Sequence, residues 1–182
     1  MRAAVLFLTG YRATGKSSVG RELARRLGRE FADTDAELEK RIETTIASYF
    51  AEHGEEAFRD EESAALESLE GLVSGPGGAI VSTGGGIILR PENVDWMRSR
   101  GSVVWLRARP ETIRARLESD PDTAAARPGL TGSSAVDEVE AVLESRRSLY
   151  IATADHAIET DDLTPAEVVQ AILEWVEAGG GT

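Results

Sequence analysis

Residues 10–17 read Gly-Tyr-Arg-Ala-Thr-Gly-Lys-Ser, which matches the phosphate-loop pattern G-x-x-x-x-G-K-[ST]. The unbroken apolar run 3–8 (AAVLFL) comes directly before it, and Val19, Leu23 and Leu27 follow at a spacing of four residues. In such a strand–loop–helix unit, backbone N–H groups at the helix N-terminus wrap the phosphates of a nucleotide. The alternative is a glycine turn that matches the pattern by chance. Such a turn would not be expected to lie between a buried strand and an amphipathic helix, as this one does.

Within the loop, each functional group suits one part of a magnesium nucleotide. Lys16 is a cation that can reach the β- and γ-phosphate oxygens, and the hydroxyl of Ser17 can bind Mg²⁺. The loop residues expected to contact the nucleotide are Ala13, Thr14, Gly15, Lys16, Ser17 and Ser18. GTPases are excluded, because they need an N-K-x-D motif and the one asparagine of the chain, Asn93, is followed by Val94.

Apolar stretches alternate with helical patterns along the whole chain. The expected strands are 3–8, 30–34, 79–83, 102–106 and 157–159. The expected helices are 15–27, 37–44, 46–53, 55–72, 91–97, 110–118, about 136–149, and one that begins at the capping box Thr164–Glu167. This alternation predicts an α/β fold with three layers, in which helices cover both faces of a five-stranded parallel sheet.

Length and charge limit the classes of protein that the chain can represent. The 182 residues predict one domain, 1–178, with a frayed tail at 179–182. Acidic residues outnumber basic ones by 32 to 20, and the net charge of −12 disfavours nucleic-acid binding. No apolar run is long enough for a membrane span, and the absence of cysteine excludes disulfides and thiolate zinc sites. We expect a cytoplasmic monomer with no nucleic-acid or membrane partner.

Ligands of open parallel sheets bind beyond the carboxyl ends of the strands, where two aspartates of this chain are expected. Motor-type ATPases carry an acidic residue there after an apolar strand, but the third strand here ends in glycines and the fourth in Arg107. The magnesium-side carboxylate is therefore assigned to the pair Asp33 and Asp35, whose spacing on an extended segment points both side chains the same way. One can hold metal-bound water while the other accepts a proton from a substrate hydroxyl. A helix N-cap is the alternative role.

Six motifs together resemble those of shikimate kinases. In order they are the phosphate loop, Asp33-Thr34-Asp35, Phe58-Arg59, Gly84-Gly85-Gly86, Arg127-Pro128 and Arg147-Ser148-Leu149-Tyr150. The resemblance covers about residues 4–176 and implies an adenylate-kinase-like P-loop fold with a substrate-binding region at about 33–60 and a mobile lid at about 120–134. It also implies transfer of the γ-phosphate of ATP, with Mg²⁺, to the 3-hydroxyl of shikimate in aromatic amino-acid biosynthesis.

The resemblance assigns roles on the reacting side of the site. It implies that Lys16, Asp35 and Arg127 are catalytic, with Asp35 touching the substrate hydroxyls as candidate base and Arg127 swinging from the lid onto the phosphates. Asp33 and Ser17 are implied on the metal side. For Arg127 the alternative is plain solvation in a polar loop.

Further roles concern substrate and adenine binding. The resemblance implies that Arg59 and Arg147 clamp the substrate carboxylate, as bidentate arginines can, and that Arg116 packs on adenine. It also implies that backbone N–H groups of the turn Gly84-Gly85-Gly86 face the substrate. The alternatives are helix ion pairs of Arg59 with Glu55, Glu56 or Glu62 and of Arg147 with Glu144, and a purely structural glycine turn.

Three departures from the usual family pattern stand out: Ala13 in place of a loop glycine, Gly129 in the lid, and Asp161-Asp162 where many relatives offer a basic residue near adenine. Two other classes of function remain as alternatives. One is another small-metabolite or nucleotide kinase, such as a gluconate kinase. The other is a nucleotide-binding regulator without turnover.

Substitution of the loop lysine tests the first assignment. Lys16→Ala should lower turnover by about 10²–10³-fold, because it removes a cation from the γ-phosphate in the transition state. Steady-state kinetics at saturating substrates would measure this. Turnover within threefold of the parent would contradict the role of Lys16.

Overall fold

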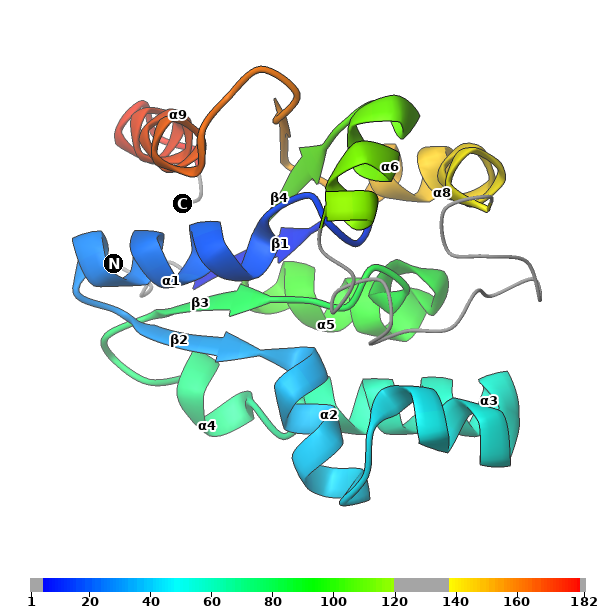
Figure 1. Ribbon diagram of the computed structural model, residues 1–182. Coiled ribbons are helices and arrows are strands. Elements are labelled where there is room, and N and C mark those ends of the chain that lie inside the picture. The colour runs from blue at the N-terminus through cyan, green and yellow to red at the C-terminus, as the bar shows by residue number, and fades with distance from the viewer. Residues whose placement is uncertain (1–4, 120–137, 181–182) are drawn as a thin grey trace.

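The computed structural model describes residues 5–119 and 138–180, and within them five parallel strands form one sheet (Figure 1). The strands are β1 (Val5–Thr9), β2 (Glu30–Asp33), β3 (Ala79–Ser82), β4 (Gly101–Arg107) and β5 (His156–Glu159). Their order across the sheet is β2-β3-β1-β4-β5, so β1 lies in the centre between β3 and β4. The predicted number of strands and their parallel direction are confirmed, with ends that shift by one or two residues.

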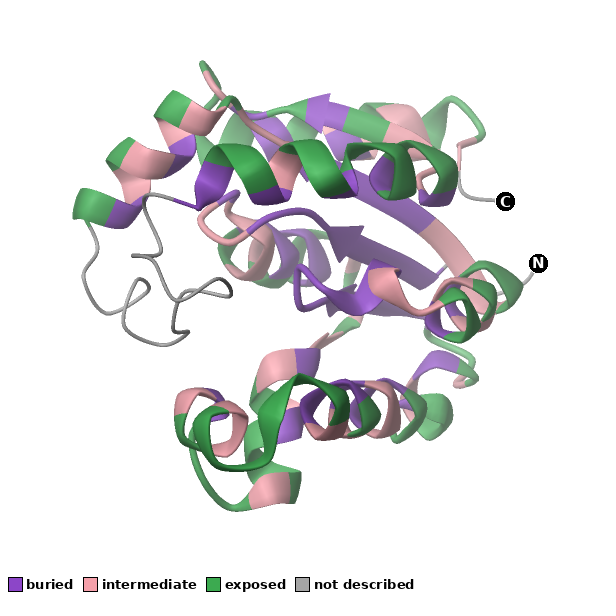
Figure 2. Cartoon of the chain, turned by 90° about the vertical axis from the view of Figure 1, so that its right-hand side faces the viewer, coloured by how far each residue is buried: buried purple, intermediate pink, exposed green. Residues whose placement is uncertain are grey.

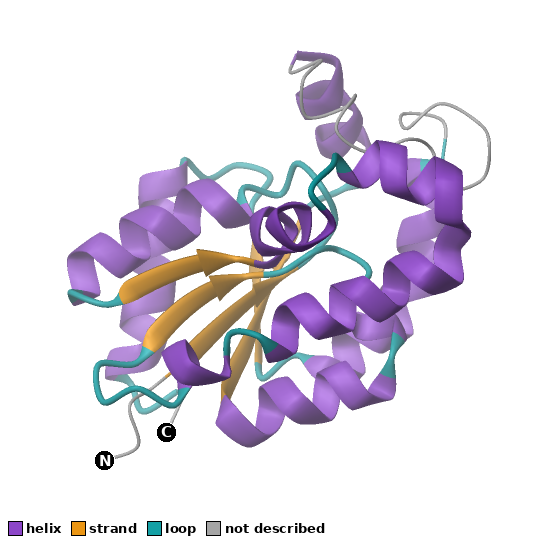
Figure 3. Ribbon diagram, turned by 90° about the horizontal axis from the view of Figure 1, so that it is seen from below, coloured by secondary structure: helices purple, strands orange, loops and turns teal. Residues whose placement is uncertain are grey.

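Helices lie along both faces of the twisted sheet (Figure 3). They are α1 (Lys16–Leu27), α2 (Thr34–Ile42), α3 (Ile46–Glu67), α4 (Glu70–Val73), the short 3₁₀ helix η1 (Ile87–Leu89), α5 (Pro91–Arg100), α6 (Pro110–Ser119), α8 (Val139–Thr153) and α9 (Pro165–Glu177). The expected lid, 120–134, and the last two residues of the expected tail lie outside the described residues.

Two hydrophobic cores, one on each face of the sheet, hold the three layers together. On one face, α1 and α9 pack on the sheet through Val19, Leu23, Val169 and Ile172. On the other face, the ends of α3 and α4 join α5 and α8 through side chains that include Leu66, Val73, Met97 and Tyr150. Residues of β1 alternate between these cores, Phe7 in one and Leu6 and Leu8 in the other. The buried strands are purple in the middle of Figure 2.

The segment after β2 departs from the prediction. The helix α2 begins at Thr34 instead of residue 37, because the side chain of Asp33 caps it by accepting the N–H of Asp35 at 3.0 Å. Asp33 is therefore extended, whereas Asp35 lies in the first helical turn. The premise that both aspartates share one extended segment was wrong.

The two helices predicted at 46–53 and 55–72 are also joined differently. They form one helix, α3, kinked at Gly54, whose φ of 81° and ψ of −179° no helix has. Together α2 and α3 form a helical layer beyond the end of β2, lowest in Figure 1. This layer includes much of the region expected to bind substrate. Among the described residues, no helix is both long and apolar enough to cross a membrane.

The capping box that opens α9 offers a test of local stability. Thr164 accepts the N–H of Glu167, and the Glu167 carboxylate accepts the N–H of Thr164 in return at 2.7 Å. Thr164→Ala should lower the free energy of unfolding by about 1 kcal/mol, because it leaves an N–H of the first turn without its acceptor. Urea denaturation would measure the loss. Ser148→Ala, at an exposed position inside α8, is the matched control and should change stability far less.

Candidate active site

The phosphate loop joins β1 to α1 and needs backbone conformations that side chains rarely allow. Gly10 has a φ of 143°, and a Cβ there would collide with the carbonyl oxygen of Leu106 on the neighbouring strand. Gly15 has a φ of 88° and forms the N-cap of α1. Ala13 also has a positive φ, 61°, so the position at which alanine replaces the usual loop glycine carries backbone strain. The resulting curved backbone is the form that concentrates N–H groups on an anion.

Two loop side chains bind the loop's own backbone. The ammonium group of Lys16 donates to the carbonyl oxygen of Tyr11 at 2.8 Å, and the Thr14 hydroxyl donates to the same oxygen at 2.8 Å. Lys16 is thus held across the loop, over the position where phosphates would enter. Ser18, by contrast, is exposed on the first turn of α1.

A hydroxyl and a carboxylate meet next to the loop. The Ser17 hydroxyl donates to Asp33 Oδ2 at 2.6 Å and lies 3.4 Å from the hydroxyl of Ser82 at the end of β3. These oxygens are the hard ligands that Mg²⁺ prefers, and Mg²⁺ commonly takes few protein ligands and completes its shell with water and phosphate. The residues expected on the metal side therefore fit the ion. No group of three or more His, Asp or Glu side chains suited to a metal occurs in residues 5–119 and 138–180.

The glycine turn after β3 lies directly against the loop and against one arginine. A Cβ on Gly85 would lie 3.0 Å from the carbonyl oxygen of Gly10, and a Cβ on Gly86 would collide with the guanidinium group of Arg59. A side chain at either position would force the neighbouring groups to shift. The N–H of Gly84 donates to the Thr34 hydroxyl at 2.9 Å, so this member of the turn does not present its N–H to a ligand.

Arg59 is buried and forms ion pairs with two glutamates. Its side chain is 8% exposed, and its two Nη atoms bind Glu62 at 2.8 Å and Glu55 at 3.2 Å. The ion pairs considered as an alternative therefore exist for Glu55 and Glu62. They do not use the whole guanidinium, because Nε is buried without a hydrogen-bond partner among the described residues. The guanidinium lies against Gly86, where it would collide with any Cβ.

The second arginine at the turn is Arg146, not Arg147. Arg146 is buried and its Nη1 donates to the carbonyl oxygen of Gly85 at 3.3 Å, beside the Tyr150 hydroxyl, which donates to the same oxygen at 2.8 Å. Burial raises the pKa of Tyr150 to about 12, and the nearby Arg146 opposes that rise. Tyr150 is therefore a neutral donor at physiological pH and fixes the orientation of the Gly85 peptide.

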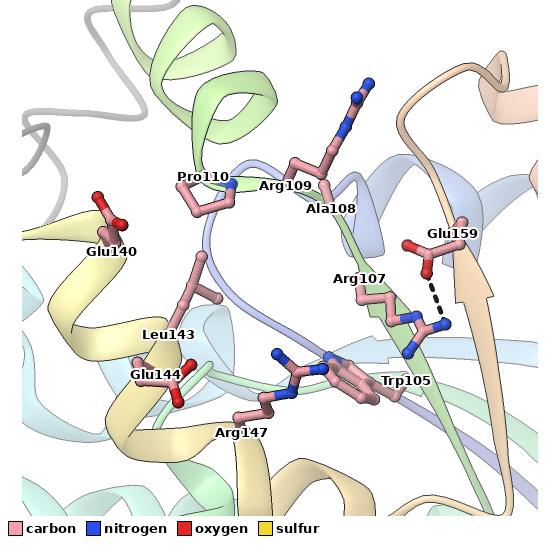
Figure 4. A pocket seen from close by; sticks show the side chains of 10 residues that line it. All are labelled: Trp105, Arg107, Ala108, Arg109, Pro110, Glu140, Leu143, Glu144, Arg147 and Glu159. Carbon is pink, nitrogen blue, oxygen red and sulfur yellow. Dashed lines mark ion pairs between the residues drawn. The ribbon is translucent and has the colours of Figure 1, made fainter.

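Arg147 does not reach the turn. It is exposed and lines a separate cavity of about 460 Å³, together with Trp105 and Leu143 and the Arg107–Glu159 ion pair (Figure 4). Of the two neighbouring arginines, the structure therefore brings Arg146 to the glycine turn and leaves Arg147 away from it. The assignment of Arg147 came from the resemblance of the motif Arg147-Ser148-Leu149-Tyr150, in which Leu149 is also exposed. The spacing of four from Val142 through Arg146 to Tyr150 was the signal that could have found the buried face.

Of the residues expected near adenine and in the lid, the structure describes Arg116 and Asp161 but not Arg127 and Gly129. Arg116 bridges two segments, donating to the carbonyl oxygen of Thr160 at 2.6 Å and to that of Ala13 at 3.2 Å. It thus ties the phosphate loop to the segment after β5, and its contact with adenine stays a prediction. Arg127 and Gly129 lie outside the described residues. Asp161 accepts the N–H of Arg109 at 2.9 Å and so has a local structural partner.

Comparison with known proteins places this site in one family. The sequence model described as "Shikimate kinase" matches residues 12–177. The chain belongs to the shikimate kinase family. A shikimate kinase of Syntrophus aciditrophicus is 40% identical over 92% of this chain and 88% of its own length, and one of Nitratidesulfovibrio vulgaris is 44% identical over 86% of both chains.

A solved shikimate kinase shares the fold. The enzyme of Acinetobacter baumannii, solved in complex with shikimate, superimposes with a TM-score of 0.86 at 32% identity, covering 97% of this chain and 94% of its own. The expected three-layer P-loop kinase fold is confirmed by this likeness and by the sheet itself. It is within this shikimate kinase framework that the glycine turn, the two buried arginines and the phosphate loop lie side by side.

The positive φ of Ala13 predicts an unusual response to glycine. Ala13→Gly should raise the free energy of unfolding by up to about 1 kcal/mol, because the strain relieved, about 1–2 kcal/mol, exceeds the entropy that glycine adds to the unfolded chain. Ala115→Gly, at an exposed position inside α6, is the matched control and should lower it by about 1 kcal/mol. Urea denaturation of both variants measures the two signs, and a loss in Ala13→Gly would show that the loop carries no strain there.

Proposed function

We propose that this protein is a shikimate kinase, which transfers the γ-phosphate of ATP to the 3-hydroxyl of shikimate. The observation that carries the proposal is the place of Arg59 and Arg146, whose guanidinium groups lie against Gly86 and Gly85. A surface with a net charge of −12 repels anions in general, so a small carboxylate needs such a local pair of cations. Membership of the family supports the same substrate.

On the donor side, the chain supplies charge and orientation. Lys16, held at the loop by the carbonyl of Tyr11, can move its ammonium group onto the phosphates when they replace that carbonyl as its partner. The N–H groups at the start of α1 add partial positive charge at the same place. Ser17 and Asp33 would hold Mg²⁺, which neutralises charge on the phosphates when bound.

On the acceptor side, Arg59 and Arg146 would hold the carboxylate and Asp35 would hold the hydroxyls. Asp35 lies in the first turn of α2, and its N–H donates to Asp33, the carboxylate proposed for the metal side. It can accept the proton of the attacking hydroxyl as the phosphoryl group arrives. Phosphoryl transfer asks for little more than this alignment and charge neutralisation.

One assay separates this function from its alternatives. Release of ADP is measured by a coupled assay with shikimate, gluconate or AMP as acceptor, at saturating magnesium ATP. We expect release with shikimate only. Release with gluconate or AMP alone would assign another kinase, and none with any acceptor would favour a nucleotide-binding regulator.

The neighbouring arginines of α8 give a matched test of the carboxylate clamp. Arg146→Ala should lower kcat/KM for shikimate by a factor that corresponds to about 2–5 kcal/mol, because it leaves a buried carboxylate without one of its partners. The KM for ATP should stay near that of the parent. Arg147→Ala, one residue away and exposed, should change neither constant by more than threefold.

The lysine variant refines this test. Arg146→Lys should recover only part of the loss, since lysine keeps the charge but not the planar fork. If Arg147→Ala were the damaging variant and Arg146→Ala the neutral one, the carboxylate would bind in the cavity of Figure 4 and the assignment would be reversed.

A further inference from the structure

A buried ion pair joins the phosphate loop to α8, although 126 residues separate its members in the chain. Arg12, in the middle of the loop, donates from Nη2 to Glu138 Oε1 at 2.8 Å. The side chains are 10% and 0% exposed. Charges removed from water in this way are costly unless they are paired and hydrogen-bonded, so their presence here needs an explanation beyond surface solubility.

Glu138 occupies a position from which its side chain could cap its own helix, α8. It is the N-cap residue of α8, and a carboxylate there commonly accepts an N–H of the first turn. Within the described residues its side chain makes no capping hydrogen bond and reaches Arg12 instead. The start of α8 is therefore fastened to the loop by this contact.

The same face of α8 then runs to the glycine turn. Glu138, Val142, Arg146 and Tyr150 are each four residues apart, so they lie in one row along the helix. The far end of the row binds the carbonyl oxygen of Gly85 through Arg146 and Tyr150. One rigid helix thus contacts the phosphate loop at its beginning and the substrate-side turn two to three turns later.

Packing fills the space between these two contacts. The Tyr11 ring, next to Arg12 in the loop, is 2% exposed and packs with Val139 and Val142 of α8. Burial raises the pKa of the Tyr11 phenol, and the charges of Arg12, Glu138 and Arg146 also act on it. The loop, the start of α8 and Arg146 therefore form one packed unit.

We infer that the Arg12–Glu138 ion pair is a positioning contact for the transfer reaction: it sets the phosphate loop, which holds the donor, relative to the α8 face that holds the acceptor. This inference rests on the proposed function. Neither residue is assigned a contact with substrate. Phosphoryl transfer depends on the alignment of donor and acceptor, and a displacement of about 1 Å can lower the rate about 10²-fold.

The test is a double-mutant cycle on kcat with Arg12→Gln, Glu138→Gln and the double variant. Each single variant should lower kcat on the order of 10²-fold and leave both KM values within threefold. The double variant should be no slower than the slower single one, because the contact is already lost. Glu140→Gln is the control: Glu140 lies on the same helix and pairs with Arg114 at 3.2 Å, but on the surface, and its loss should leave kcat unchanged.

A merely structural role makes a different forecast. The midpoint of urea unfolding would fall in each single variant while kcat per folded molecule stayed within threefold of the parent, and that result would overturn the inference. A rise in the KM for shikimate at unchanged kcat would also overturn it, because Arg12 would then be a substrate ligand.

Two further measurements keep the outcomes distinct. If Arg12→Gln does not fold, Arg12→Lys, which keeps the charge, decides the matter: an intermediate kcat supports the inference and a parental one opposes it. The parent is assayed with shikimate first. An inactive parent would refute the proposed function, whereas an active parent with unaffected variants would refute only the positioning role.

Discussion

The site depends on the close approach of backbone to backbone at the carboxyl ends of β1, β3 and β4. Gly10 leaves no room for a Cβ beside the Leu106 carbonyl, and Gly85 lies almost against the carbonyl of Gly10. Because of these contacts, the backbones of the phosphate loop and the glycine turn lie directly against each other. Donor and acceptor sites can then be adjacent without any side chain between them, which is what direct phosphoryl transfer requires.

The charged groups are arranged around this backbone by burial. Arg59 and Arg146 approach the turn from two different helices, α3 and α8, and each is at least nine-tenths buried. Burial strengthens their interaction with an anion because the surrounding dielectric is low. It also explains why Glu62 accompanies Arg59 and why Glu138 accompanies Arg12, since an unpaired cation at such depth would be costly.

Helix α8 connects these features. Its packed face meets the loop through Glu138, the sheet through Tyr150, which stacks on Trp105 with ring centroids 5.2 Å apart, and the turn through Arg146. Its exposed face carries Arg147 and Glu140. A helix used in this way transmits position along its length because its hydrogen-bonded backbone is stiff, and small shifts at one end move the other.

The sequence by itself determined the features that depend on local chemistry. Residue type and spacing within short segments predict the phosphate loop, the five strands and the capping box of α9, and the alternation of strands with helices predicts the parallel sheet. They do so because helix capping and hydrophobic periodicity depend on residues that are close in the sequence. The strain at Ala13 could also be foreseen, since the glycine missing from the loop marked the position.

Only the tertiary structure decided which side chains meet. Successive residues of a helix point about 100° apart, so Arg146 reaches the glycine turn whereas Arg147, the next residue, is exposed. The contact of Arg12 with Glu138 joins residues 126 positions apart, and no local pattern predicts which of the 32 acidic residues a given arginine will find. Such pairings are fixed when the layers pack, because packing alone determines which faces are buried against each other.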